Sequence, residues 1–140
     1  MKSNDFKTYI QRKHAPKESH LQAQCVAWFR SQYPDRARLL FAIPNGARLY
    51  GNATQRAIQW RKLEREGAVK GAADLMLAIP SGDYGGLFIE MKTTAKHSRQ
   101  SKAQAQFEED AVAHGFGYAM PRTFDEFMSV VINYLDKGEY

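Results

Sequence analysis

The sequence predicts an α/β fold in which a mixed β-sheet is flanked by helices, with the element order α-β-α-β-β-α-β-α. Three observations support this class. Apolar residues recur at helical spacing in four segments, short apolar runs bounded by turn residues lie between them, and 44% of the 140 residues are apolar. That length and composition are sufficient for one domain with its own core, which we expect over residues 18–140.

The first half of the chain is expected to hold two helices and one strand. A helix is predicted over Glu18–Tyr33, where a periodic apolar face ends before a proline. The residues of that face are Leu21, Cys25, Trp28 and Phe29. A strand follows at Arg38–Ile43 and ends in the turn signal Pro44-Asn45-Gly46. A second helix is expected within Gly51–Gly67, and its Trp60 is predicted to lie in the core, as are Cys25 and Trp28.

The stretch Lys70–Lys92 is predicted to form a β-hairpin. Its apolar runs Leu75–Ile79 and Leu87–Met91 are separated by Pro80–Gly86, which is rich in turn-forming residues. The turn is short, so we expect no inserted specificity element there.

The second half of the chain continues with a basic linker and three further elements. After the linker Thr93–Gln100, a helix is predicted over Ser101–His114 and a strand over Gly117–Met120. The last helix begins at Thr123, where a glutamate three residues later gives a capping-box pattern. Its apolar face consists of Phe124, Phe127, Val130, Val131 and Tyr134.

Charge and cysteine content exclude several classes of protein. The net charge of +5 and pI of about 9.4 indicate an anionic partner such as nucleic acid, and residues 1–17 are expected to form a basic leader. A single cysteine excludes an internal disulfide and a thiolate zinc site of the usual kind. No signal peptide or membrane-length apolar run occurs, so we expect a cytoplasmic protein with no membrane partner.

Three charged residues are expected to meet at one end of the hairpin. Asp74 opens the first apolar run, whereas Glu90 and Lys92 close the second, and antiparallel pairing brings these positions together. Glu90 and Lys92 are two residues apart and therefore point to the same face of a strand. Carboxylates at the end of an apolar hairpin are costly to bury without a partner. The residues by themselves leave two accounts open, an ion pair or a divalent cation site.

Five segments in a fixed order resemble a known nuclease family. Asp74 followed by Glu90-Met91-Lys92 resembles the active-site signature of the PD-(D/E)xK nuclease superfamily. Together with the flanking segments, the order is similar to that of the VRR-NUC domain, from about Glu18 to Pro121. The segments are Glu18-Ser-His-Leu-Gln22, Pro44-Asn45-Gly46, Lys70-Gly71-Ala-Ala-Asp74-Leu75, Ile89-Glu90-Met91-Lys92 and Ser101-Lys-Ala-Gln104. The resemblance implies a restriction-endonuclease-like fold.

The resemblance also implies a catalytic metal site. Asp74, Glu90 and the main-chain carbonyl of Met91 would bind Mg²⁺ or Mn²⁺, and Lys92 would lie beside the attacking water. Glu18 on the first helix would complete the metal site, directly or through water. One departure concerns Ala73, which occupies a position where these families often have proline and bears on strand entry.

Other residues receive supporting or DNA-binding roles. Gln104 resembles the helix glutamine that faces the site and is counted as catalytic, although a buried structural amide is the alternative. Gln22, Asn45 and Lys70 are expected to support the site. A further set of basic residues is predicted to contact DNA, with solvated surface charge as the competing account. These residues are Arg48, Arg56, Arg61, Lys96, Arg99 and Lys102.

The function implied is a metal-dependent, structure-selective DNA endonuclease without an organic cofactor. Standalone VRR-NUC proteins, many from phages and bacteria, resemble Holliday-junction resolvases, and symmetric cleavage of a junction implies a homodimer. The last helix and the leader are candidate dimer surfaces. The alternatives are a monomeric flap or end-processing nuclease, a nuclease acting on RNA, and a catalytically silent DNA-binding module of the same fold.

Overall fold

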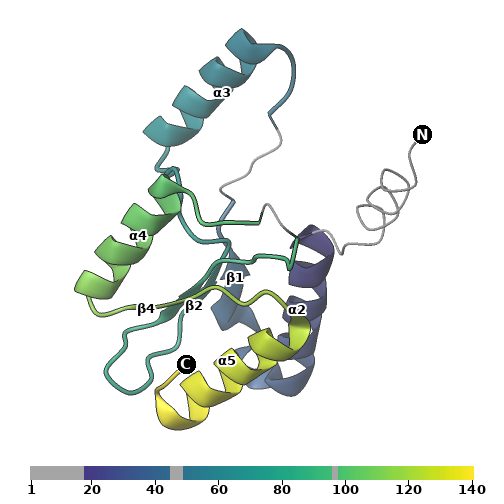
Figure 1. Ribbon diagram of the computed structural model, residues 1–140, viewed down its shortest axis with the longest axis vertical. Helices are drawn as coiled ribbons and strands as arrows, with labels where there is room; N and C mark the ends of the chain where they lie inside the picture. Colours follow the sequence, from purple (N-terminus) through teal and green to yellow (C-terminus); the bar gives the residue numbers. More distant parts are fainter. Residues whose placement is uncertain (1–17, 45–48, 96–97) are drawn as a thin grey trace, which may run out of the picture.

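The protein is built on a mixed four-stranded sheet. The computed structural model describes residues 18–44, 49–95 and 98–140 (Figure 1). The strands lie in sequence order across the sheet: β1 (Leu40–Ala42), β2 (Leu75–Leu77), β3 (Leu87–Ile89) and β4 (Gly117–Ala119). β1 pairs with β2 and β2 with β3 in antiparallel fashion, whereas β3 and β4 are parallel. The predicted α/β class and mixed sheet are confirmed, with strands shorter than expected.

The helices occupy the predicted segments. They are α2 (Glu18–Gln32), α3 (Ala53–Arg65), α4 (Lys102–Ala113) and α5 (Phe124–Lys137). A 3₁₀ helix, η1 (Pro34–Leu39), which the sequence pattern did not predict, connects α2 to β1. Within the described ranges, none of the helices is sufficiently long and apolar to cross a bilayer.

The core lies between the sheet and the pair α2 and α5. Phe29 of α2 and Phe127 and Val131 of α5 are fully buried against the leucines of the strands. Trp28 packs edge-to-face at the margin of this core. The last helix was predicted as a candidate dimer surface, and this stays a prediction. Its residues Phe127, Val131 and Tyr134 are buried in the domain's own core, so a dimer contact would use the other side of the helix. The other predicted dimer surface, the leader of residues 1–17, lies outside the described residues.

Helix α3 extends away from the sheet (Figure 1), and none of its 13 residues is fully buried. Its fixed geometry comes instead from local polar contacts. Asn52 and Gln55 form a capping box, and the side chain of Gln59 bonds both backbone polar groups of Tyr50. The prediction that Trp60 belongs to the core is wrong, because α3 does not pack along the sheet.

Candidate active site

The sheet brings Asp74 and Glu90 to one edge. Asp74 lies just before β2 and Glu90 just after β3, and the antiparallel register pairs Leu75 with Ile89. Glu90 is 3% exposed and Lys92 is 6% exposed. The predicted meeting of these groups at one end of the hairpin is confirmed, and we call this edge, formed by Asp74, Glu90 and Lys92, the carboxylate end.

Backbone hydrogen bonds fix the segment that follows β3. The N–H of Glu90 donates to the carbonyl of Ala119 at 2.8 Å, and the N–H of Lys92 donates to that of Pro121 at 3.2 Å. Between them, the N–H of Met91 donates to Oδ2 of Asp74 at 2.7 Å. Because successive side chains of an extended chain point to opposite faces, the side chains of residues 90 and 92 lie on the same face of this segment.

Gln104 joins the acid and the amine. Its Nε2 donates to Oε1 of Glu90 at 2.5 Å, and its Oε1 accepts from Nζ of Lys92 at 3.1 Å. Nζ of Lys92 also lies 3.6 Å from Oε1 of Glu90. The same Oε1 of Gln104 accepts from the N–H of Ser101 at 2.8 Å, in a capping box at the start of α4. The helix cap therefore orients the amide so that its nitrogen faces Glu90.

A glycine allows α4 to approach the hairpin. Gly71 has a φ of +85°, and a Cβ placed there would lie 2.4 Å from the main-chain carbon of Ala103. Only glycine combines a favourable positive φ with the absence of a Cβ, so no other residue type fits here without movement of the backbone. The close approach sets the first turn of α4, and with it Gln104, beside the carboxylate end.

Burial raises the pKa of both acids. Desolvation, followed by the charge of Asp74, raises the pKa of Glu90 to about 7. Desolvation likewise raises the pKa of Asp74, against the lowering effect of the Met91 N–H. Two buried side-chain oxygens among the described residues have no hydrogen-bond partner, Oε2 of Glu90 and Oη of Tyr118. Of these, only the first belongs to a carboxyl group.

Glu18 lies within electrostatic reach of the site. Its charge contributes to the raised pKa of both Asp74 and Glu90. Its Oε1 accepts a hydrogen bond from Oγ of Ser98 at 3.2 Å. Gln22, one turn further along α2, lines a separate hollow beside β1, and no described contact joins it to the acids. The first-helix acid is thus near the site, whereas Gln22 faces another surface.

The donor set suits a hard cation bound by few protein ligands. Within the described ranges, no three His, Cys, Asp or Glu side chains converge closely enough to hold an ion by themselves. Mg²⁺ commonly binds one or two carboxylates and completes its shell with water and phosphate oxygens. The unpartnered Oε2 of Glu90 beside Asp74 fits that requirement, with Glu18 placed to act through water.

A pocket of about 270 Å³ opens at the carboxylate end. It is lined by Trp60, Lys70, Gly71, Asp74, Ser101, Ala103 and Gln104. Lys70 therefore lies where a site-supporting residue was predicted. Trp60 was not predicted here, since its place in an apolar stripe favoured the core.

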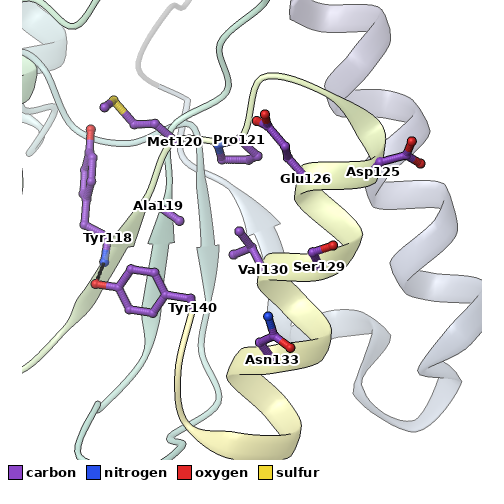
Figure 2. A pocket seen from close by; sticks show the side chains of 10 residues that line it. All are labelled: Tyr118, Ala119, Met120, Pro121, Asp125, Glu126, Ser129, Val130, Asn133 and Tyr140. Atoms are coloured by element: carbon purple, nitrogen blue, oxygen red, sulfur yellow. Dashed lines mark hydrogen bonds between the residues drawn. The ribbon is translucent and has the colours of Figure 1, made fainter.

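A larger hollow between β4 and α5 lies apart from these residues (Figure 2). Tyr140 closes one side of it, where its hydroxyl accepts from the N–H of Tyr118 at 3.0 Å. None of the predicted site residues lines this hollow.

The predicted DNA-binding residues do not form one continuous described surface. Arg99 and Lys102 are exposed. Lys102 is the first residue of α4 and lies between Ser101 and Ala103, which line the pocket. On α3, Arg56 donates to the carbonyl of Gly51, and Arg61 lines an outer hollow with Ile58. Arg48 and Lys96 of this set lie outside the described ranges, as does Asn45, which was predicted to support the site.

Comparisons with known proteins identify the fold. No protein-family model and no curated protein matches the sequence. Among solved structures, a protein described as "VRR_NUC domain protein" superposes with a TM-score of 0.72 and 23% identity. The match covers 89% of this chain and 92% of that chain. The chain therefore has the fold of a VRR-NUC domain, as its sequence motifs predict.

Proposed function

We propose that the protein is a metal-dependent DNA endonuclease that hydrolyses phosphodiester bonds. The observation that carries the proposal is the buried carboxylate oxygen of Glu90 that lacks a hydrogen-bond partner, near the carboxyl group of Asp74, which lines a pocket. Such an arrangement costs stability, and a bound cation would offset that cost. The VRR-NUC fold supports the same conclusion.

The residues divide the chemistry among them. Asp74, Glu90 and the carbonyl of Met91 would hold Mg²⁺ or Mn²⁺, with Glu18 acting through water. A bound cation would supply a hydroxide nucleophile at neutral pH and neutralise charge on the phosphoryl oxygens.

Lys92 and Gln104 have the supporting roles. Nζ of Lys92 lies 3.6 Å from the Glu90 carboxylate and 3.1 Å from the Gln104 amide, so it is held at the site and does not reach into solvent. From that position the ammonium would orient the attacking water or stabilise the transition state. Gln104 positions both groups and so acts through them.

We propose branched DNA as the substrate, cut by a homodimer in the manner of a Holliday-junction resolvase. The basic composition and the exposed Lys70, Arg99 and Lys102 support an anionic polymer. Two active sites related by a two-fold axis would cut a four-way junction symmetrically. A monomeric flap nuclease is the main competing form, and an inactive DNA-binding module is the non-enzymatic one.

The test is cleavage of labelled four-way, flap, duplex and single-stranded DNA, and of RNA, with and without Mg²⁺. Wild type should cut branched DNA only with the metal, and Lys92→Ala should lose the activity. Lys137→Ala, at the opposite end of the fold, is the matched control and should cut normally. If Lys92→Ala cuts as well as wild type, the catalytic assignment is wrong. A strictly monomeric mass at assay concentration would exclude the resolvase form.

A further inference from the structure

The pocket at the carboxylate end has an aromatic wall contributed by α3. Trp60 lines it together with Lys70, Asp74 and Gln104. It is partly buried, and its ring makes no described contact with another aromatic ring. Trp28 differs, because it packs edge-to-face against Tyr33, Phe124 and Phe127. One tryptophan is thus used for packing and the other faces the site.

The dimensions of the pocket limit what can bind against this ring. A volume of about 270 Å³ lies just below the range of about 300–1,000 Å³ typical of sites for drug-sized ligands. The lining combines an aromatic ring, an ammonium group and a carboxylate. These groups suit one unit of a polymer, with a planar base against the indole and a phosphate beside Lys70.

We propose that Trp60 stacks on an unpaired base adjacent to the scissile phosphate and thereby selects DNA that is branched, frayed or single-stranded. A base within a duplex is stacked on both faces, so its face is not available to the indole. An unpaired base at a branch point has a free face, and stacking on an aromatic side chain is tolerant of sequence. This inference rests on the proposed nuclease function and names the feature of the substrate that the site recognises.

The competing account is that Trp60 only anchors α3 to the domain. Leu63, three residues later on the same helix, also faces inward. It lines a different, apolar hollow together with Phe88 and Phe107 and does not line the site pocket. Leu63→Ala is therefore a matched control, since it weakens the attachment of α3 without removing a group from the site.

The first experiment measures fluorescence. The chain contains two tryptophans, so in a Trp28→Phe background Trp60 is the sole indole emitter. Metal-free protein is titrated with fully paired duplexes and with duplexes that carry a single-stranded branch, and binding is followed separately by anisotropy. We expect emission to be quenched by branched DNA and much less by paired DNA at equal saturation. Unchanged emission at saturating branched DNA would overturn the proposal, whether or not the protein cleaves DNA.

The second experiment compares variants. Trp60→Leu should bind branched DNA about 30-fold more weakly, at the centre of the range for loss of one stacked base. Trp60→Phe should restore most of that affinity, whereas binding to paired DNA should change little in either variant. Leu63→Ala should lower the melting temperature and leave the preference for branched DNA intact. Equal loss of that preference in Trp60→Leu and Leu63→Ala would show that Trp60 is only an anchor.

Discussion

The two ends of the sheet differ in how fully their buried polar groups are hydrogen-bonded. At the carboxylate end, Glu90 is buried with one oxygen unpartnered. At the other end, which we call the tyrosine end (Ile79, Ser81 and Tyr134), the contacts are complete. Oη of Tyr134 donates to the carbonyl of Ile79 at 2.6 Å, and Oγ of Ser81 donates to the carbonyl of Tyr134.

The difference separates stability from function. Buried polar groups in folded proteins are normally hydrogen-bonded, and those that are not commonly mark functional sites. The tyrosine end follows the rule and ties α5 to the turn after β2. The carboxylate end violates this rule. Removing the Glu90 charge should therefore lower activity without lowering stability, whereas removing a hydrogen bond at the tyrosine end should lower stability and leave activity nearly unchanged.

The largest effect is expected for Glu90→Gln. The change removes a proposed metal ligand and should lower the cleavage rate by at least about 100-fold. Burial and the charge of Asp74 raise the pKa of Glu90 despite the nearby Lys92. Its ionised form therefore costs folding free energy, and the metal-free variant should melt at a higher temperature than wild type at pH 8. Cleavage assays and thermal unfolding in EDTA measure both effects. A variant that is inactive and also less stable would contradict the contrast between the two ends.

The pH dependence of stability tests the same charge without any substrate. The pKa of Glu90 is raised from 4.5 in the unfolded chain to about 7 in the fold. The unfolded state therefore loses its proton first as pH rises, and the contribution of Glu90 to stability declines between pH 4.5 and 7 and then levels off. The loss is at most roughly 3 kcal/mol.

The measurement is thermal unfolding of metal-free wild type and Glu90→Gln from pH 4.5 to 8. The melting-temperature advantage of the variant should grow as pH rises and reach its full size above pH 7. Added Mg²⁺ should reduce the difference in melting temperature between the variant and wild type, because it stabilises wild type alone. An advantage that stays constant with pH would mean that Glu90 is not the group that titrates.

The sequence was sufficient to locate the carboxylate end, because the relevant geometry is local. Alternation along a strand and pairing about a short turn determine where Asp74, Glu90 and Lys92 lie. The role of Gln104 also has a local signal in the sequence, since Ser101 followed by Gln104 three residues later is a capping-box pattern. The cap fixes the amide whose nitrogen faces Glu90.

The position of Trp60 has no such local signal. An apolar stripe on a helix predicts that one face packs inward but not which neighbour it meets. The direction of α3 depends on features of the fold outside the helix. Those are tertiary features, so periodicity alone placed Trp60 in the core, whereas the fold puts it in the wall of the pocket.

Gly71→Ala tests how closely α4 must approach the carboxylate end. Its positive φ makes alanine strained by about 1–2 kcal/mol, and the added Cβ would also collide with Ala103. We expect lower thermal stability and a large loss of cleavage because Gln104 shifts with α4. Gly67→Ala is the matched control, since Gly67 has a φ of +108° with nothing within 4 Å of an added Cβ. Equal cleavage by the two variants would show that the position of α4 does not matter.

Tyr134→Phe should have the smallest effect on activity and tests the tyrosine end. It leaves the carbonyl of Ile79 without the hydroxyl that donates to it at 2.6 Å, so the domain should lose about 1–2 kcal/mol of unfolding free energy. Cleavage below the melting transition should stay within about twofold of wild type, because the change lies at the end of the sheet away from Glu90. Urea unfolding measures the first effect and the junction assay the second. If Tyr134→Phe lowers cleavage as strongly as Gly71→Ala, the two ends are mechanically coupled and stability and function are not divided between them.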